Sequence, residues 1–140
     1  MKRDFLTMKD YSREEILQIL DIAKDMKKNP DQYANALKGK QLAMLFQKTS
    51  TRTRVSFEVG MEQLGGHAIF MDWRTTNFTL SALDDETKVL SRYVNVIMAR
   101  VFAQKDLEIM AHAATVPVSV SNAAMRLRVC PPMLVKAPPR

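Results

Sequence analysis

Residues 50–54, Ser-Thr-Arg-Thr-Arg, concentrate side chains that could bind an anion. They lie between a short apolar run at 41–46 and an amphipathic stretch at 54–64. If the run is a strand and the stretch is a helix, the first backbone N–H groups of that helix have no intrahelical partner. Those groups, together with the positive end of the helix dipole, favour an anion such as phosphate.

The side chains of this segment add further donors. Ser50, Thr51 and Thr53 carry hydroxyl groups, and Arg52 carries a planar guanidinium that matches phosphate oxygens. Arg100 follows a second apolar run, so it should also emerge at the carboxyl end of a strand, where α/β folds bind ligands. Two arginines at one edge of a sheet favour a phosphate site over scattered surface charge.

The segment matches neither of the common nucleotide-binding motifs. The pattern G-x-x-x-x-G-K-[ST] is absent, and the four glycines do not form a G-x-G-x-x-G fingerprint. The alternative interpretation is structural. The hydroxyls would cap a helix, while Arg52 and Arg54 would lie in solvent or pair with carboxylates such as Glu58.

The elements that must position these residues alternate along the chain. Helical periodicity predicts helices at 12–28, 54–64, 84–94 and 104–114. Apolar runs predict strands at 41–46, 67–72, 95–101 and 115–120. A capping box of Ser12 and Glu15 should begin the first helix, and Val55, Val59 and Leu64 should face inward from the second. This alternation predicts the α/β class, with a parallel sheet of about four strands flanked by helices.

Composition limits the class of protein. A chain of 140 residues with 46% hydrophobic residues fits one core, and the net charge is +6. Residues 1–108 carry 17 basic and 15 acidic side chains, so most of the excess charge lies in the last 32 residues. Because no continuous basic stripe with interleaved aromatics is present, nucleic acid is a poor candidate partner.

The sequence also bears on compartment and metal binding. Cys130 is the single cysteine, so an internal disulfide and a cysteine-built metal site are both excluded. The start of the chain has no apolar region typical of a secretory signal, and no apolar run approaches ~18 residues. We expect a cytoplasmic protein that neither spans nor binds a membrane.

The segment FQKTSTRTRVSFEVGMEQLGGHAIFMD (46–72) resembles the carbamoyl-phosphate signature of the aspartate/ornithine carbamoyltransferase family. Similarity also covers TKVLSRYVNVIMARV (87–101) and LEIMAHAATVPV (107–118), so we assign residues 1–118 to a carbamoyl-phosphate-binding domain. Within the family, the sequence of these segments is most similar to that of ornithine and putrescine carbamoyltransferases.

The resemblance implies a function for each matching residue. Carbamoyl phosphate would be bound by Ser50, Thr51, Arg52, Thr53 and Arg100, with Arg52 and Arg100 also catalytic. Arg54 would be mainly structural. The reaction would transfer the carbamoyl group to an amine such as ornithine, forming citrulline in arginine metabolism, without a metal or organic cofactor. The family also implies a homo-oligomer, a trimer.

The sequence departs from the family pattern after the fourth predicted strand. The family's His-Pro-x-x-Gln motif has no counterpart there, and His67 and His112 are expected to be structural. Residues 119–140 contain four of the six prolines, and we expect a divergent, irregular tail. We further expect a truncated chain without the amine-binding domain. The alternative function is a non-catalytic fragment that binds an anion or associates with other subunits.

Overall fold

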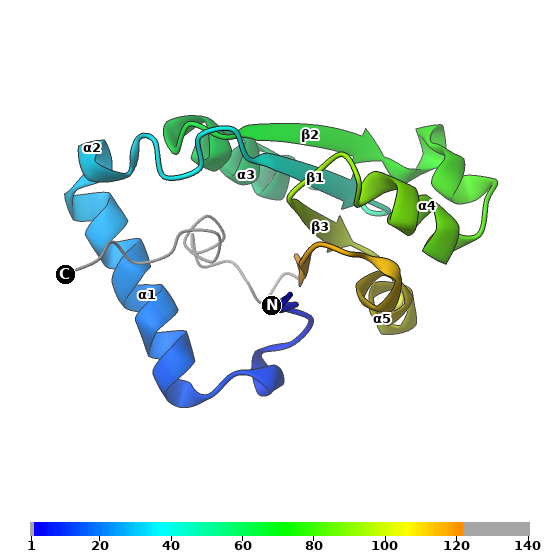
Figure 1. Cartoon of the computed structure of the whole chain (residues 1–140), viewed down its shortest axis with the longest axis horizontal. Helices are drawn as coiled ribbons and strands as arrows, with labels where there is room; N and C mark the ends of the chain where they lie inside the picture. Colours follow the sequence, from blue (N-terminus) through cyan, green and yellow to red (C-terminus); the bar gives the residue numbers. More distant parts are fainter. Residues whose placement is uncertain (1, 122–140) are drawn as a thin grey trace.

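A single parallel sheet organises the molecule. The computed structural model describes residues 2–121. The strands are β1 (Gln41–Phe46), β2 (His67–Asp72), β3 (Val96–Arg100) and β4 (Val118–Val120). Their order is β2-β1-β3-β4, and each neighbouring pair is parallel (Figure 1). The prediction of an α/β fold with about four parallel strands is confirmed.

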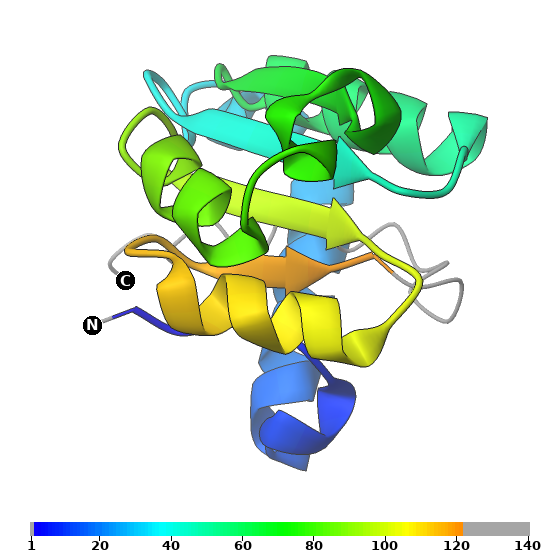
Figure 2. The same ribbon diagram turned by 90° about the vertical axis from the view of Figure 1, so that its right-hand side faces the viewer.

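Helices cover both faces of the sheet. The α-helices are α1 (Arg13–Lys28), α2 (Pro30–Tyr33), α3 (Thr51–Gln63), α4 (Leu83–Leu90) and α5 (Gln104–Ala113). Three short 3-10 helices, η1 (Met8–Asp10), η2 (Trp73–Thr75) and η3 (Asn77–Thr79), lie in the connections. Helices α4 and α5 lie on one face, with α1 and α3 on the other (Figure 2). Among residues 2–121, no helix is long and apolar enough to cross a membrane.

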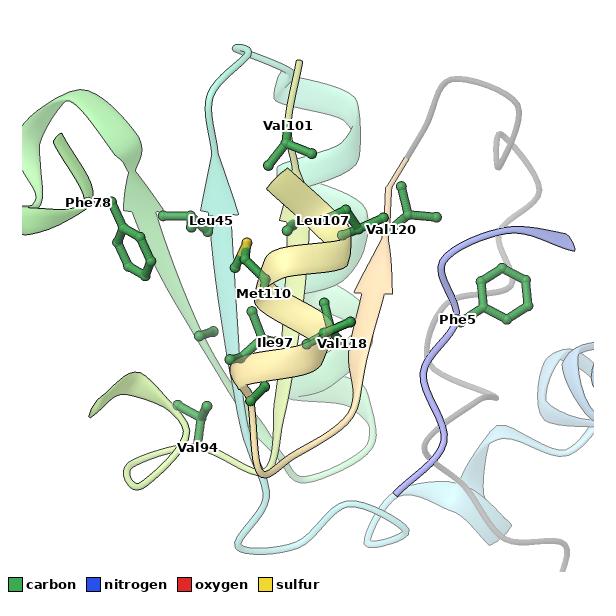
Figure 3. Close-up of a cluster of buried hydrophobic side chains, with 14 residues drawn as sticks. Phe5, Leu45, Phe78, Val94, Ile97, Val101, Leu107, Met110, Val118 and Val120 are labelled. Atoms are coloured by element: carbon green, nitrogen blue, oxygen red, sulfur yellow. The ribbon is translucent and has the colours of Figure 1, made fainter. Parts of the chain in front are cut away.

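Two buried clusters follow from the alternation of side chains along the strands. On the face covered by α5, Leu107 and Met110 pack with Ile97, Val118 and Val120 (Figure 3). On the opposite face, residues of β1 and β3 pack against α3, in the cluster that contains Leu42, Met44, Phe46, Phe57, Met61 and Met98. The central strands are therefore buried on both sides, which explains their almost uniformly apolar sequences.

The α1 and α3 helices test two of the sequence predictions. The capping box at α1 is confirmed, because Ser12 accepts from the Glu15 amide and Glu15 accepts from the Ser12 amide. The expectation that Val55 and Val59 face inward is wrong, since they are 48% and 46% exposed. The buried residues of α3 are Phe57 and Met61, each two positions after one of these valines. Because two residues turn a helix by about 200°, they lie on the opposite side of α3. Leu64 is buried as expected.

The first residues of the chain extend the sheet at β4, which the sequence analysis did not predict. The Phe5 amide donates to the Val118 carbonyl at 2.8 Å, and the Val120 amide donates to the Phe5 carbonyl at 2.8 Å. Asp4 accepts from the Val118 amide at 2.8 Å. This pairing closes an otherwise open strand edge and places the Phe5 ring in the core (Figure 3). Most of the predicted tail, residues 122–140, lies outside the described residues.

Candidate anion-binding site

The site lies where the chain leaves β1 and β3 in opposite directions. Strand β1 continues through α3 to β2, whereas β3 continues through α5 to β4 on the other side of the sheet. The last residues of the two strands, Phe46 and Arg100, are paired in the sheet. Such a switch point opens a crevice beyond the carboxyl ends of the strands. We call residues 47–54 and 100–106 the carboxyl edge.

The first turn of α3 presents its backbone donors without a side-chain cap. Ser50 occupies the N-cap position in extended conformation, with φ −165° and ψ 93°, but its side chain makes no capping hydrogen bond. Its hydroxyl instead donates to Thr53 Oγ1 at 2.9 Å. The backbone N–H groups of Thr51, Arg52 and Thr53 therefore keep their capacity to bind an anion at the positive end of a 13-residue helix.

Arg100 reaches across to this helix from the end of β3. Its Nη1 donates to Thr53 Oγ1 at 3.4 Å, which brings together two of the residues predicted from the sequence. Its Nε is buried and has no hydrogen-bond partner among residues 2–121. A buried donor without a partner is costly, so this nitrogen marks a position where an acceptor would be favourable.

Two arginines at this edge, Arg52 and Arg100, are not neutralised by neighbouring carboxylates among residues 2–121. No ion pair within residues 2–121 includes Arg52 or Arg100. Lys48 adds a third cation, and its Nζ lies 4.6 Å from the centre of the Phe102 ring. Thr51 and Arg52 are exposed, so a ligand from solvent could reach them. The arrangement can hold an anion between a helix N-terminus and two guanidinium groups.

Arg54 belongs to the same sequence motif but points elsewhere. Its Nε donates to Glu58 Oε1 at 2.9 Å, and its guanidinium carbon lies 3.9 Å from the centre of the Phe70 ring. These contacts use both the charge and the flat face of the group, which favours the predicted structural role. The structural interpretation of the motif therefore describes Arg54, whereas the exposed Arg52, which forms no ion pair within residues 2–121, is compatible with either interpretation.

The remaining candidates of the sequence analysis lie away from the carboxyl edge. His67 begins β2, at the opposite end of the sheet, and His112 lies near the end of α5. Within residues 2–121, no group of three or more His, Cys, Asp or Glu side chains is placed to hold a metal ion.

Gln47, the first residue after β1, was not predicted as a functional residue from the sequence. Its backbone amide donates to the Arg100 carbonyl at 2.9 Å, and its side chain contacts Phe102 and Asp106. Its place directly after a strand was the only signal in the sequence, because its two partners, in the loop after β3 and in the first turn of α5, are distant along the chain.

Comparison with known proteins relates this arrangement to a family. Residues 3–126 match the family model described as aspartate/ornithine carbamoyltransferase, carbamoyl-P binding domain. An ornithine carbamoyltransferase of Anoxybacillus flavithermus is 49% identical over 120 residues, which cover 83% of this chain and 38% of that protein. One from Pyrococcus horikoshii is 50% identical over 119 residues, covering 83% and 38%.

Solved structures agree with this assignment. Ornithine carbamoyltransferase from Pyrococcus furiosus superimposes with a TM-score of 0.80 at 49% identity, covering 84% of this chain and 39% of that one. The catalytic subunit of M. jannaschii aspartate transcarbamoylase gives a TM-score of 0.76 at 35% identity, covering 87% and 41%. The chain thus spans about two fifths of the length of these relatives. It belongs to the aspartate/ornithine carbamoyltransferase family, in which it matches the carbamoyl-P binding domain.

Proposed function

We propose that this chain binds carbamoyl phosphate at the carboxyl edge. In this proposal the phosphate group lies at the N-terminus of α3, held by the backbone amides of the first turn, by hydroxyl groups and by two guanidinium groups. The residues are Ser50, Thr51, Arg52, Thr53 and Arg100. The observation that carries the proposal is the buried Nε of Arg100, which lacks a partner within residues 2–121 and lies beside an uncapped helix terminus.

The proposed reaction is transfer of the carbamoyl group to an amine such as ornithine. The amine nitrogen attacks the carbamoyl carbon, the bond from that carbon to the phosphate oxygen breaks, and the amine loses a proton. Arg52 and Arg100 would stabilise the negative charge that develops on the departing phosphate and on the carbonyl oxygen. Holding both substrates in place would supply much of the remaining acceleration. With ornithine the product is citrulline, which places the reaction in arginine metabolism.

This reaction needs no metal or organic cofactor, since guanidinium groups provide the positive charge. We also propose that the protein acts in the cytoplasm as a homotrimer. The exposed apolar side chains of Val55 and Val59, one turn apart on α3, support association.

A second candidate function is anion binding without transfer. The sequence after β4 contains no histidine and no His-Pro-x-x-Gln motif, so it lacks the histidine and glutamine that would donate to the carbamoyl oxygen in that motif. A chain that binds carbamoyl phosphate but cannot polarise its carbonyl would act through association with other subunits.

Thermal unfolding tests binding first. We expect carbamoyl phosphate at 100 times its Kd to stabilise the chain by about 2.7 kcal/mol. Arg52→Ala should lose most of this shift, because a charge-assisted contact to phosphate is removed. Arg92→Ala is the matched control, since Arg92 is exposed and lies between α4 and β3, at the opposite end of the sheet.

Two further results separate the candidates. If the parent chain unfolds cooperatively and shows no shift, the binding proposal fails. If the parent shifts, citrulline formation from carbamoyl phosphate and ornithine distinguishes transfer from binding alone.

A further inference from the structure

We propose that Gln47 is a positioning residue for the phosphate site, which acts by holding the segment after β3 so that Arg100 faces the N-terminus of α3. This inference rests on the binding function proposed above. In this proposal Gln47 does not contact the phosphate ligand itself, and its effect passes through Arg100.

The side chain of Gln47 uses both of its polar atoms to join different parts of the carboxyl edge. Its Oε1 accepts from the Phe102 amide at 2.6 Å, and its Nε2 donates to Asp106 Oδ2 at 3.2 Å. Its own backbone amide donates to the Arg100 carbonyl at 2.9 Å. One residue after β1 therefore fixes the end of β3, the loop that follows, and the first turn of α5.

Few other contacts hold this segment. Val101 is buried in the core cluster, but residues 102–105 are all exposed, and the Phe102 ring is 70% exposed. Hydrophobic burial therefore anchors the loop at one residue only. The two hydrogen bonds of the Gln47 side chain hold the residues that follow Val101.

Arg100 depends on that anchor because its own side chain is weakly held. Its contact with Thr53 is long, at 3.4 Å, and no carboxylate of residues 2–121 pairs with it. The direction of the guanidinium is thus set mainly by the backbone at the end of β3. A loop that shifts by a fraction of an ångström would weaken a geometry-dependent contact to phosphate.

Asp106 makes the amide of Gln47 preferable to a carboxylate. An amide accepts at one atom and donates at the other, as the Phe102 amide and the Asp106 carboxylate require. A glutamate at position 47 would keep the bond to Phe102 but would face the Asp106 carboxylate with no proton between them. Exchanging the two groups, with Glu at 47 and Asn at 106, restores a donor and an acceptor at unchanged net charge.

The test measures binding of inorganic phosphate and of carbamoyl phosphate by calorimetry, using the full chain. We expect Gln47→Met, which keeps the size of the side chain, to weaken both ligands about tenfold, because two hydrogen bonds that fix the loop are lost. Gln47→Glu should also weaken binding, and Gln47→Glu combined with Asp106→Asn should recover most of the loss.

Ser91→Ala is the matched control for a general loss of stability. Ser91 Oγ donates to the Thr87 carbonyl at 2.7 Å and accepts from the Thr115 amide at 3.3 Å, so it joins a helix to a loop at the opposite end of the sheet. Its loss should lower the melting temperature while leaving both Kd values within about twofold. Hydrogen exchange gives a second readout: the Phe102 amide should exchange faster in Gln47→Met but not in Ser91→Ala.

The outcomes separate this inference from the proposed function. If the parent binds phosphate, Arg52→Ala does not, and Gln47→Met binds as the parent does, the role of Gln47 is wrong while the site stands. Equal weakening by Gln47→Met and Ser91→Ala would likewise overturn it, as would a double variant that recovers nothing. If the parent binds neither ligand, the proposed function fails, and the role of Gln47 in binding fails with it.

Discussion

The two ends of the sheet differ in how their loops satisfy polar groups. At the amino end, which we call the amino edge (residues 37–41, 64–67, 91–96 and 114–118), the loops bond to one another. The Leu37 amide donates to the Leu64 carbonyl at 2.8 Å, and the His67 amide donates to the Lys40 carbonyl at 2.9 Å. Asn95 Oδ1 accepts from the Gln41 amide at 2.8 Å.

At the carboxyl edge Gln47 joins the loops after β1 and β3, but several donors remain available. The first turn of α3 has no side-chain cap, and Arg100 keeps a buried nitrogen without a partner in residues 2–121. The same four strands thus end in loops that stabilise the fold at one edge, and in loops that offer donors to a ligand at the other. The comparison predicts that substitutions at the amino edge change stability, whereas substitutions at the carboxyl edge change ligand response.

The largest expected effect is the loss of stability in Gly65→Ala, at the amino edge. Gly65 has φ +76°, and an added Cβ would lie 2.8 Å from the carbonyl oxygen of Ala34. The left-handed conformation alone costs about 1–2 kcal/mol for a residue with a side chain. The contact with a backbone atom adds to this, so we expect a total of about 2–4 kcal/mol in the free energy of unfolding. Urea unfolding measures it.

Gly39→Ala is the control that isolates the backbone term. Gly39 has φ +74°, but an added Cβ would meet nothing within 4 Å. It should therefore lose only the conformational part, about 1–2 kcal/mol. Equal losses in the two variants would mean that the loop around Ala34 yields easily, and the amino edge would then be less rigid than its hydrogen bonds imply.

The next effect is expected at the carboxyl edge, where Arg100→Met should separate stability from ligand response. Arg100 is partly buried, and its buried Nε lacks a partner within residues 2–121, so replacing the side chain removes a desolvation penalty and should make the ligand-free chain about 1 kcal/mol more stable. The stabilisation by carbamoyl phosphate should fall sharply in the same variant. Thermal unfolding with and without ligand gives both values.

Arg92→Met provides the reference for a surface arginine at the amino edge, and it should change stability by less than about 0.5 kcal/mol. A clear destabilisation by Arg100→Met would contradict the comparison. It would show that Arg100 contributes to the fold itself rather than to a ligand site.

The sequence predicted the features of both edges that depend on local patterns. The strands were evident because burial on both faces makes residues such as Met44 and Ile97 part of uninterrupted apolar runs. The cluster of residues 50–54 was evident because Ser, Thr and Arg are concentrated where a strand gives way to a helix. The capping box at Ser12 needs only two residues at a fixed spacing.

The features that the sequence did not predict depend on partners far away in the chain. Val55 and Val59 have the spacing of a buried face, but the side of α3 that meets the sheet is set by Phe57 and Met61, which are larger. The importance of Gln47 appears only when the loop after β3 lies beside it. Periodicity shows that a helix has an apolar side, and tertiary packing decides which apolar residues are covered.

The smallest expected effect is a pH dependence at the carboxyl end of β2. The Arg74 guanidinium and backbone amide donate to Asp72, and they lower the pKa of that carboxyl from 3.8 to about 2. Because the folded pKa is lowered, the carboxylate stabilises the fold at pH values above about 4. This contribution disappears as the pH falls from about 4 to about 2. The side chain of Arg74 is 70% exposed and that of Asp72 is 26% exposed, so solvent screens the pair, and the contribution should be small and should shrink further in high salt.

Asp72→Asn should therefore lower the melting temperature slightly at pH 7 and progressively less below pH 4, where the parent carboxyl also becomes neutral. Arg74→Gln should produce a similar loss at pH 7, and combining the two substitutions should add little, because both remove one interaction. A difference between the parent and Asp72→Asn that stays constant from pH 7 to pH 2.5 would exclude the ion pair as its cause. The loss would then come from a part of the interaction that does not depend on charge, such as the geometry of the hydrogen bond by which Asp72 caps η2. In that case the carboxyl end of β2 would be held in the manner of the amino edge, by neutral hydrogen bonds rather than by charge.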